Sequence, residues 1–441
     1  MMIKIYTYPS KSAEKRVSAV SNRGLSFSKK DHADVLRILQ TVQKKGDSAL
    51  IHYVNRFDAP NLKLSDLKVS NAEMAEAAEK VDADFLKSLN RAAFQIDQFH
   101  RRQVRQSWIQ TDRPGTLLGQ LVTPVDAAGI YVPGGKSGKT PLVSSVLMGA
   151  IPAKIAGVKQ VVMATPPTAE GGVSPYLLAA AKKAGVNAVY KIGSAWAIAA
   201  LAYGTQTIPK VDVIVGPGNI YVTLAKKIVS GTVGIDMIAG PSEILVLADD
   251  TADPAFIAAD LLSQAEHDAL ASAILVTNSK KIAAAVAGEM EKQLAQLDRR
   301  EIAEASLAAY GAIFVVQEMA KAVTLANQFA PEHLELMVQN PFDYIGKLRN
   351  AGAIFMGHYT PEPVGDYMAG PNHVLPTAGT ARYASALSVD NFIKKTSILH
   401  YDREAFLAEA EDIIRLAEIE GLGAHARSVR VRLKSETPAD S

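Results

Sequence analysis

The chain has 441 residues, of which 48% are hydrophobic, and a formal net charge of +2. This length predicts about two to four globular domains with sizeable cores. Basic and acidic residues are interspersed, which excludes the one-signed surface that nucleic acids and anionic membranes select. Cysteine is absent. That excludes disulfides, thiolate ligands and thiol nucleophiles, so any metal must be held by nitrogen and oxygen.

The N-terminal sequence MMIKIYTYPSKSAEKRV lacks the apolar segment of a signal peptide. No charge-free stretch reaches the ~18 apolar residues that are needed to cross a bilayer. We therefore expect a cytoplasmic protein.

Residues 1–110 are charged and carry apolar residues at i, i+3 and i+4, which predicts surface helices. From about residue 120, short apolar runs such as GIYVP, QVVMATPP and VDVIVG alternate with Ala-rich helical segments. A second series of apolar runs, again separated by helical segments, comprises EILVLADD, SAILVTN, GAIFVV and AGAIFMG. This alternation predicts parallel sheets covered on both faces, in two doubly wound α/β domains. The tail from about residue 386 contains one amphipathic helix, REAFLAEAEDIIRLAEIEG, and ends in the polar SETPADS.

Four short segments place a histidine near a carboxylate or carboxamide: SQAEHD, APEH, EPVGDYMAGPNH and EGLGAH. Four of the nine histidines fall in these segments. A single buried histidine is more often a core residue than a functional one, but four together favour metal ligands and proton carriers. The candidate residues are Gln264, His267, Glu332, His333, Asp366, His373, Glu420 and His425.

Asp253 and Pro254 suit the N-cap and first turn of a helix, which we expect to run through Gln264 and His267. Because these two residues are three apart, they would share one face of that helix and reach one ion. On this segment alone, an exposed polar helix end is the favoured alternative.

Glu332 and His333 are adjacent, so in a regular strand their side chains would point to opposite faces. They can serve one site only if the chain bends there. The pair Ala330-Pro331 is the sequence hint of such a bend.

Two glycine-rich stretches are candidates for phosphate contact. GGKSGKT, residues 134–140, resembles a P-loop, but Pro133 stands where that pattern requires glycine. GPGNIY, residues 216–221, has only the first two glycines of the dinucleotide-binding pattern. Amides at such turns before a helix suit a phosphate. Both stretches therefore stay open as cofactor contacts, with tight strand-to-helix turns as the alternative.

Eight longer segments follow one another along the chain: YVPGG, VLMGAIPAKIAGV, GPGN, GTVGIDMIAGPSEILV, DLLSQAEHD, FAPEHLEL, YTPEPVGDYMAGPNHVLPT and EGLGAHA. Together they closely resemble the histidinol dehydrogenase family, over roughly residues 20–432. The resemblance implies the last step of histidine biosynthesis, a four-electron oxidation of L-histidinol to L-histidine through bound L-histidinaldehyde. It also implies two NAD acting in succession and one Zn²⁺ in each site.

The same resemblance implies roles for single residues. By motif match, the zinc ligands are Gln264, His267, Asp366 and His425, and the acid/base pair is Glu332 and His333. The implied substrate contacts are Ser242, His373 and Glu420, together with the zinc ligands and His333. The implied NAD contacts are Tyr131, Asn219 and the position of Trp196.

The implied fold has two Rossmann-like doubly wound domains with small helical N- and C-terminal segments, in an intertwined homodimer. We expect an N-terminal dimerisation segment (1–27), a first domain on the zinc and substrate side (28–131 and 243–385) and a second domain on the NAD side (132–242). The tail, residues 386–441, would carry Glu420 and His425 into the active site of the partner.

Two features depart from the family pattern. The chain reads IGSAWA where the family usually reads IGGAQA, so Trp196 replaces a glutamine that contacts NAD. The indole is expected to pack against a cofactor ring. The loop after YVPGG is about three residues longer than usual and adds Lys136 and Lys139, which either approach a pyrophosphate or stay solvated.

Two alternatives stay open. A paralogue on the same scaffold would oxidise another small amino or sulfonated alcohol, although Ser242, His373 and Glu420 favour histidinol. A P-loop nucleotide-binding protein is supported by GGKSGKT alone. NADH formation with histidinol, or ATP turnover without it, distinguishes these functions.

Overall fold

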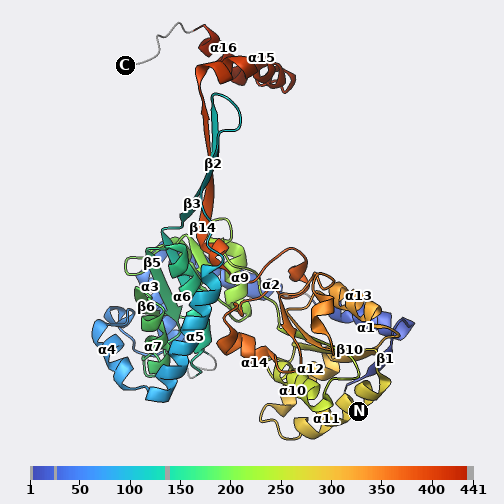
Figure 1. Cartoon of the computed structure of the whole chain (residues 1–441). Helices are drawn as coiled ribbons and strands as arrows, with labels where there is room; N and C mark the ends of the chain where they lie inside the picture. The colour runs from blue at the N-terminus through green and yellow to red at the C-terminus, as the bar shows by residue number, and fades with distance from the viewer. Residues whose placement is uncertain (1–2, 24–26, 135–139, 435–441) are drawn as a thin grey trace. The chain divides into compact units, whose positions relative to one another are not determined.

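The structure is a computed structural model that describes residues 3–23, 27–134 and 140–434. The chain divides into two compact units, one of residues 1–104 and 125–392 and one of residues 105–124 and 393–441. The first unit contains two parallel sheets, and the second contains an antiparallel sheet (Figure 1). Lys136, Lys139 and the terminal SETPADS lie outside the described residues.

The first sheet has six strands, all parallel. Alternate residues of its central strand enter two separate cores, because Ile244 and Val246 face one set of helices and Leu245 and Leu247 face the other. The strand order is β1 (Ile5–Thr7), β11 (Ala312–Val315), β10 (Ser272–Thr277), β9 (Glu243–Ala248), β12 (His333–Met337) and β13 (Ala353–Met356). One face is covered by α10 (Pro254–Ala265), α11 (Lys280–Leu294) and α12 (Arg300–Tyr310), and the other by α1 (Lys11–Ser21) and α13 (Met319–Phe329).

The N-terminal segment belongs to this sheet. Strand β1 pairs in parallel with β11, and Ala13, Val17 and Val20 of α1 pack into the core on one face. Residues 1–27, expected to serve dimerisation, thus extend the sheet of their own chain where they are described. A role in a dimer stays a prediction.

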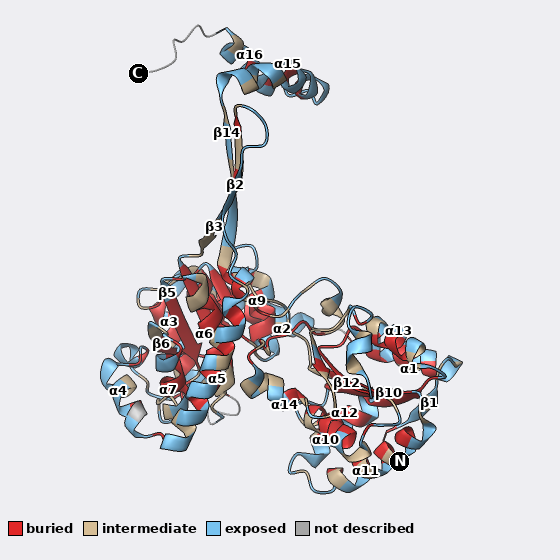
Figure 2. Ribbon diagram, in the orientation of Figure 1, coloured by how far each residue is buried: buried red, intermediate tan, exposed pale blue. Residues whose placement is uncertain are grey.

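The second sheet has five parallel strands, and Figure 2 shows its buried residues between the flanking helices. Its order is β6 (Ala188–Lys191), β5 (Gln160–Thr165), β4 (Ala127–Tyr131), β7 (Val213–Val215) and β8 (Gly234–Ile235). One face packs on α5 (Ala83–Arg101), α6 (Val143–Ala156) and α7 (Pro175–Lys183), with α4 (Asn71–Glu79) beside α7. The other packs on α2 (Lys29–Lys45), α3 (Asp47–Phe57), α8 (Ser194–Tyr203) and α9 (Ile220–Val229). The expected alternation of strands and helices in parallel sheets is therefore confirmed.

The grouping of the early helices differs from the expected division, which joined residues 28–131 to residues 243–385. Strand β4 is the central strand of the five-stranded sheet, and α2, α3 and α5 cover that sheet. The reason is the apolar stripe of α2, because Val35, Leu39 and Val42 are buried in one core with α8 and α9.

The second unit is a small antiparallel sheet followed by two helices. Strand β14 (Ile393–Tyr401) pairs along its whole length with β3 (Thr116–Pro124), which also pairs with β2 (Trp108–Gln110). The predicted amphipathic helix is α15 (Arg403–Ile419), which packs on α16 (Gly423–Leu433). Large apolar side chains of this unit stay exposed, among them Leu399, Leu416 and Ile419. Among the described residues, no helix is long and apolar enough to cross a membrane.

Two glycines within helices yield opposite predictions. A Cβ on Gly149 of α6 would lie 2.6 Å from Cγ2 of Ile130 in β4, whereas a Cβ on Gly288 of α11 meets no described atom within 4 Å. Gly149→Ala should therefore destabilise the fold by about 1–3 kcal/mol through overpacking. Gly288→Ala should stabilise it by about 0.5–1 kcal/mol, because alanine loses less backbone entropy. Urea denaturation measures both, and equal shifts would contradict the packing of α6 on β4.

Candidate active site

The predicted acid/base pair lies at the amino-terminal end of β12. Ala330 ends α13 with φ 49° and ψ 58°, a left-handed turn, and the chain bends there as the sequence suggested. Glu332 follows this turn and His333 is the first residue of β12. Both side chains are buried, and Nδ1 of His333 lies 3.8 Å from Oε2 of Glu332. The bend therefore brings two adjacent residues into one site.

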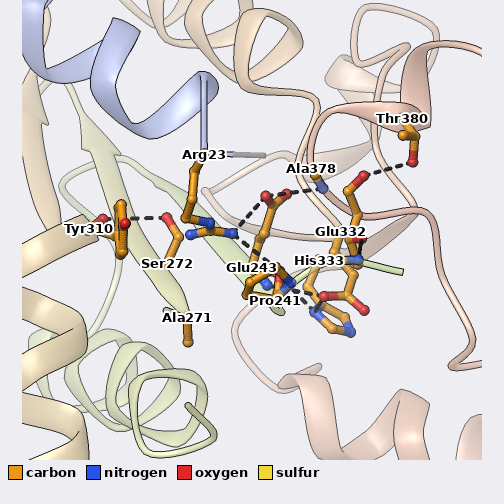
Figure 3. Close-up of polar contacts among 12 residues, drawn as sticks. Arg23, Pro241, Glu243, Ala271, Ser272, Tyr310, Glu332, His333, Ala378 and Thr380 are labelled. Carbon is orange, nitrogen blue, oxygen red and sulfur yellow. Dashed lines mark hydrogen bonds and ion pairs between the residues drawn. The ribbon is translucent and has the colours of Figure 1, made fainter. Parts of the chain in front are cut away.

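The backbone of Glu243, at the start of β9, holds both side chains (Figure 3). Its N–H donates to Oε2 of Glu332 over 3.0 Å. Its carbonyl oxygen accepts from Nδ1 of His333, also over 3.0 Å. Because a carbonyl oxygen only accepts, Nδ1 carries the proton and Nε2 of a neutral His333 is available as a base.

Burial sets the protonation of this pair. It raises the pKa of Glu332 well above its ordinary value, and the neighbouring carboxylates Glu243 and Glu362 raise it further. Burial also lowers the pKa of His333, so the imidazole is neutral near neutral pH. A carboxyl with a raised pKa is a stronger base than an ordinary one, and a neutral imidazole can accept a proton, so both groups suit general acid/base catalysis.

A group of potential metal ligands adjoins the pair. Glu362 of α14 (Glu362–Val364) and Asp366 of η4 (Gly365–Ala369) are four residues apart on consecutive helical turns. One ligand atom from each of His333, Glu362 and Asp366 lies within 4.8 Å of the others, an arrangement that can hold a metal ion. Asp366 was a predicted ligand, whereas Glu362 was not singled out. The spacing of two acids four apart was the signal that pointed to it.

The segment SQAEHD ends α10. Asp253 caps this helix as predicted, accepting from Ala255 N–H over 2.8 Å. The helix ends at Ala265, so the expectation that it continues through His267 was wrong. His267 lies in the following turn, where its N–H donates to the carbonyl oxygen of Gln264 over 3.2 Å. The last turn of α10 tightens in this way because the C-terminal carbonyl groups of a helix need donors.

The side chains of this segment fit a metal site. Gln264 is fully buried, and neither its Oε1 nor its Nε2 has a hydrogen-bond partner among the described residues. A buried carboxamide without a partner is rare in proteins, and a ligated cation would satisfy its oxygen. Burial and the neighbouring His333 lower the pKa of His267, which favours the neutral imidazole that binds metals.

The other predicted substrate residues fall in two places. Ser242 immediately precedes Glu243. His373 is hydrogen-bonded to the backbone of Asp366, and burial lowers the pKa of its imidazole to about 4. Glu420 and His425 belong to the second unit, where Glu420 ends α15, His425 lies in α16, and both are exposed.

Two buried acids behind the site were missed from the sequence. Oε1 of Glu335 accepts from the N–H of Glu362 over 2.9 Å, and burial raises the pKa of Glu335 to about 9. Burial likewise raises the pKa of the adjacent Asp260 to about 6. Glu335 follows His333 by two residues on β12 and shares its face, which was the available signal.

Two predicted NAD contacts lie at the carboxyl ends of strands in the five-stranded sheet. Tyr131 ends β4, and the GPGN turn (Gly216–Asn219) follows β7. The chain adds β5 and β6 on one side of β4 and then β7 and β8 on the other, so the strand order reverses between β4 and β7. In open parallel sheets, ligands bind at such reversal points, outside the carboxyl ends of the strands.

The GPGN turn is held rigidly. Lys226 and Asp236 form a buried ion pair that holds the backbone of Gly216. Lys226 Nζ donates to the carbonyl oxygen of Gly216 over 2.9 Å, and Asp236 Oδ2 accepts from the N–H of Gly216 over 2.8 Å. Asn219 caps α9 by accepting from Tyr221 and Val222. The turn is therefore a tight strand-to-helix connection that also presents Asn219 at the reversal point.

Trp196 is mostly covered by protein. It is 5% exposed and stacks on Tyr53 and Phe57, with ring centroids 5.7 and 5.5 Å away. Its Nε1 donates to Oδ2 of Asp58 over 3.1 Å. Little of the indole surface is available to a cofactor ring in this conformation.

Ser194, the other departure in IGSAWA, begins α8 with φ 48°, in the left-handed region that favours glycine. Its N–H donates to the hydroxyl oxygen of Tyr131 over 3.1 Å. The contact links the changed segment directly to a predicted NAD contact.

The fold and this site define an α/β protein with a buried Glu–His pair among potential metal ligands. The sequence pattern of the family described as histidinol dehydrogenase matches residues 22–433. The chain therefore belongs to the histidinol dehydrogenase family.

Individual relatives agree with this assignment. A histidinol dehydrogenase of Desulfotalea psychrophila is 57% identical over 397 residues, covering 90% of this chain and 92% of the relative. That of Heliobacterium mobile is 51% identical and covers 98% of this chain and all of the relative (100%). The crystal structure of histidinol dehydrogenase from Elizabethkingia anophelis superimposes with a TM-score of 0.91 at 38% identity, covering 98% of each chain.

Asp58 provides a pH prediction. Burial raises its pKa to about 6, although the Trp196 indole and the Gly193 backbone oppose this shift. A raised carboxyl pKa stabilises the fold below about pH 4, and the contribution is lost as the pH rises through 6. Relative to Asp58→Asn, the unmodified protein should therefore lose roughly 2 kcal/mol between pH 4 and 7. Urea denaturation at both pH values tests this, with the exposed Asp250→Asn as control; a difference independent of pH would contradict the assignment.

Proposed function

We propose that the protein oxidises L-histidinol to L-histidine through bound L-histidinaldehyde, using Zn²⁺ and two successive NAD. The supporting observation is that one residue, Glu243, holds Glu332 and His333 together, and that His333 lies within 4.8 Å of the potential metal ligands Glu362 and Asp366. This is the pairing that an alcohol oxidation followed by a hydration-dependent oxidation requires.

Zinc would be held by Gln264, His267 and Asp366, with His425 of the partner subunit as the remaining ligand. These nitrogen and oxygen donors fit Zn²⁺ in a chain that has no cysteine. The carboxamide of Gln264 supports this fit, because no residue that the structure describes forms a hydrogen bond with it. When bound, the ion supplies open positions that orient the imidazole and amine of histidinol.

In the first oxidation, we assign His333 as the base. Its neutral Nε2 takes the hydroxyl proton of the alcohol as hydride leaves the same carbon for NAD. The hydrogen bond from Nδ1 to the Glu243 carbonyl oxygen keeps the ring in the tautomer that can accept this proton. The products of the step are the aldehyde, NADH and the protonated imidazole.

The second oxidation needs a carbon that can release another hydride. Without cysteine, the route is addition of water to the aldehyde, which forms a gem-diol. Glu332 takes one proton of that water, and the protonated His333 left by the first step returns its proton to the aldehyde oxygen. Burial raises the pKa of Glu332, which makes its carboxylate a stronger base than an ordinary one. Hydride then leaves the diol for the second NAD while the neutral His333 takes a hydroxyl proton, and the carboxylic acid remains. Ser242 and His373 would contact the substrate, together with the partner subunit's Glu420.

NAD would bind to the Rossmann-like five-stranded sheet at the point where its strand order reverses. Tyr131 and Asn219 lie at that point. Trp196 remains a predicted contact, made through the small part of its indole that is exposed. Asp58, Tyr53 and Phe57 position that ring.

The two bases can be separated by substitution. The unmodified protein should form two NADH for each histidinol and release little aldehyde. Glu332→Gln should slow aldehyde oxidation more than alcohol oxidation, because only the former needs activated water, and His333→Asn should slow both. Stopped-flow NADH formation from each substrate measures this. Equal losses on both substrates in Glu332→Gln would contradict the roles, and one NADH with accumulating aldehyde would contradict the two-step oxidation.

A homodimer with shared sites is part of the proposal. The second unit carries Glu420 and His425 and exposes large apolar side chains, including Ile419 at 76% exposure. Apolar surface of this kind is usually covered by a partner. In an isologous dimer, each tail would then complete the neighbouring site.

Subunit complementation tests the sharing. His425→Asn and Asp366→Asn should each be inactive as homodimers. Mixed dimers of the two should recover activity, because one of their two sites receives the intact His425 of one chain and the intact Asp366 of the other. Activity is assayed after co-refolding differently tagged chains and purifying the heterodimer. Heterodimers without activity would show that each tail completes the site of its own chain.

A further inference from the structure

A buried arginine reaches the active site from the N-terminal segment. Arg23 follows α1 and is 6% exposed. Its Nη2 donates to Oε1 of Glu243 over 2.8 Å and to the carbonyl oxygen of Pro241 over 3.2 Å (Figure 3). These acceptors lie on either side of Ser242, the proposed substrate contact. The arginine therefore anchors, through two hydrogen bonds, the chain segment that leads into β9.

The Glu243 carboxylate is fixed from a second direction. The same Oε1 accepts from the N–H of Ala378 over 3.2 Å, five residues after His373. The guanidinium of Arg23 lies over the ring of Tyr310, 5.3 Å from its centroid. The side chain of Glu243 thus joins the N-terminal segment to the segment that follows His373.

We propose that Arg23 and Glu243 are positioning residues for the oxidation. The inference rests on the proposed function, because it takes the roles of Glu332, His333 and Ser242 from there. The Glu243 N–H and carbonyl oxygen hold Glu332 and His333, while its side chain is held by Arg23. Rotation of residues 241–243 would move all three proposed site residues together.

Charge reinforces this arrangement. The Arg23–Glu243 pair is nearly dry, and removing one member leaves the other charge buried without compensation. A single Nη2 makes both hydrogen bonds, so a shift of the guanidinium loosens Pro241 and Glu243 at once. A misplacement of about 1 Å at a reacting group can reduce turnover about 100-fold.

Arg16 provides a matched control. It lies on α1 in the same segment, and its guanidinium donates to the carbonyl oxygens of Ala309 and Gly311 over 2.8 and 2.6 Å, at the end of α12. It thus anchors the N-terminal segment beside Tyr310 through hydrogen bonds like those of Arg23. None of its described hydrogen bonds reaches residues 241–243. Substitution of either arginine should therefore weaken the anchoring of the N-terminal segment, whereas only substitution of Arg23 should disturb the position of residues 241–243.

The experiment compares Arg23→Met with Arg16→Met in the metal-loaded full-length enzyme. Measurements are kcat and KM for histidinol and for histidinaldehyde, metal content and the thermal unfolding midpoint. We expect Arg23→Met to lower kcat on both substrates by about 10- to 100-fold. KM for both substrates and metal content should stay within about two-fold, because no proposed ligand is removed. Arg16→Met should lower the unfolding midpoint while kcat stays within about two-fold.

Two further variants keep the test decisive if Arg23→Met does not fold. Arg23→Lys retains the charge but presents one ammonium in place of a planar fork, so it should recover part of the kcat. Glu243→Gln keeps both the shape and an acceptor oxygen, and its kcat should fall between those of the unmodified enzyme and Arg23→Met. In the double variant Arg23→Met with Glu243→Gln, the losses should not multiply, because both act through one contact.

The outcomes separate the two proposals. The positioning role is overturned if kcat is unchanged in Arg23→Met or in both milder variants. It is also overturned if the loss of kcat merely follows the loss of thermal stability seen in Arg16→Met. In either case the proposed oxidation of histidinol stands. An unmodified enzyme that forms no NADH from histidinol overturns the proposed function and the positioning role with it.

Discussion

The site depends on the parallel pairing of β9 with β12. This register sets His333 opposite Ile244, so the residue before Ile244, Glu243, lies beside the start of β12. Its backbone forms hydrogen bonds with the side chains of both Glu332 and His333. The backbone of a buried parallel strand is among the most rigid parts of a protein, because every peptide group is hydrogen-bonded and both faces are packed. The pair is therefore oriented by the sheet itself and not by flexible loops.

The proposed ligand contacts lie at opposite ends of the strands in the two sheets. The proposed NAD contacts lie at the carboxyl ends of strands in the five-stranded sheet, where helix N-termini favour phosphate groups. In the six-stranded sheet, Glu332, His333 and Glu243 lie at the amino ends instead. Gln264 and His267 lie at the C-terminal end of α10, where the helix dipole favours a cation. Each edge thus has the backbone electrostatics that suits its proposed ligand.

Buried acids are the energetic cost of this site. Glu332, Glu335 and Glu362 are nearly inaccessible, and burial raises the pKa of each. Carboxylates in such surroundings must be protonated or paired with a cation. Arg23 supplies one positive charge at the end nearest Glu243. A divalent ion near Asp366 would supply the other. The buried carboxamide of Gln264, which has no hydrogen-bond partner in the described part of the chain, supports the same conclusion.

The sequence by itself determined the alternating α/β architecture, the Asp253 cap, the bend before Glu332 and the family, because periodicity, capping and motifs are encoded in neighbouring residues. Only the tertiary structure decided which sheet the early helices cover, that β1 joins β11, and that α10 ends before His267. It also decided the contact between Arg23 and Glu243, which are 220 residues apart. Neither residue belongs to a motif that marks the other as its partner. Contacts of this kind arise when distant strands and helices bury their apolar faces together, and no local pattern specifies which polar groups that burial brings into contact.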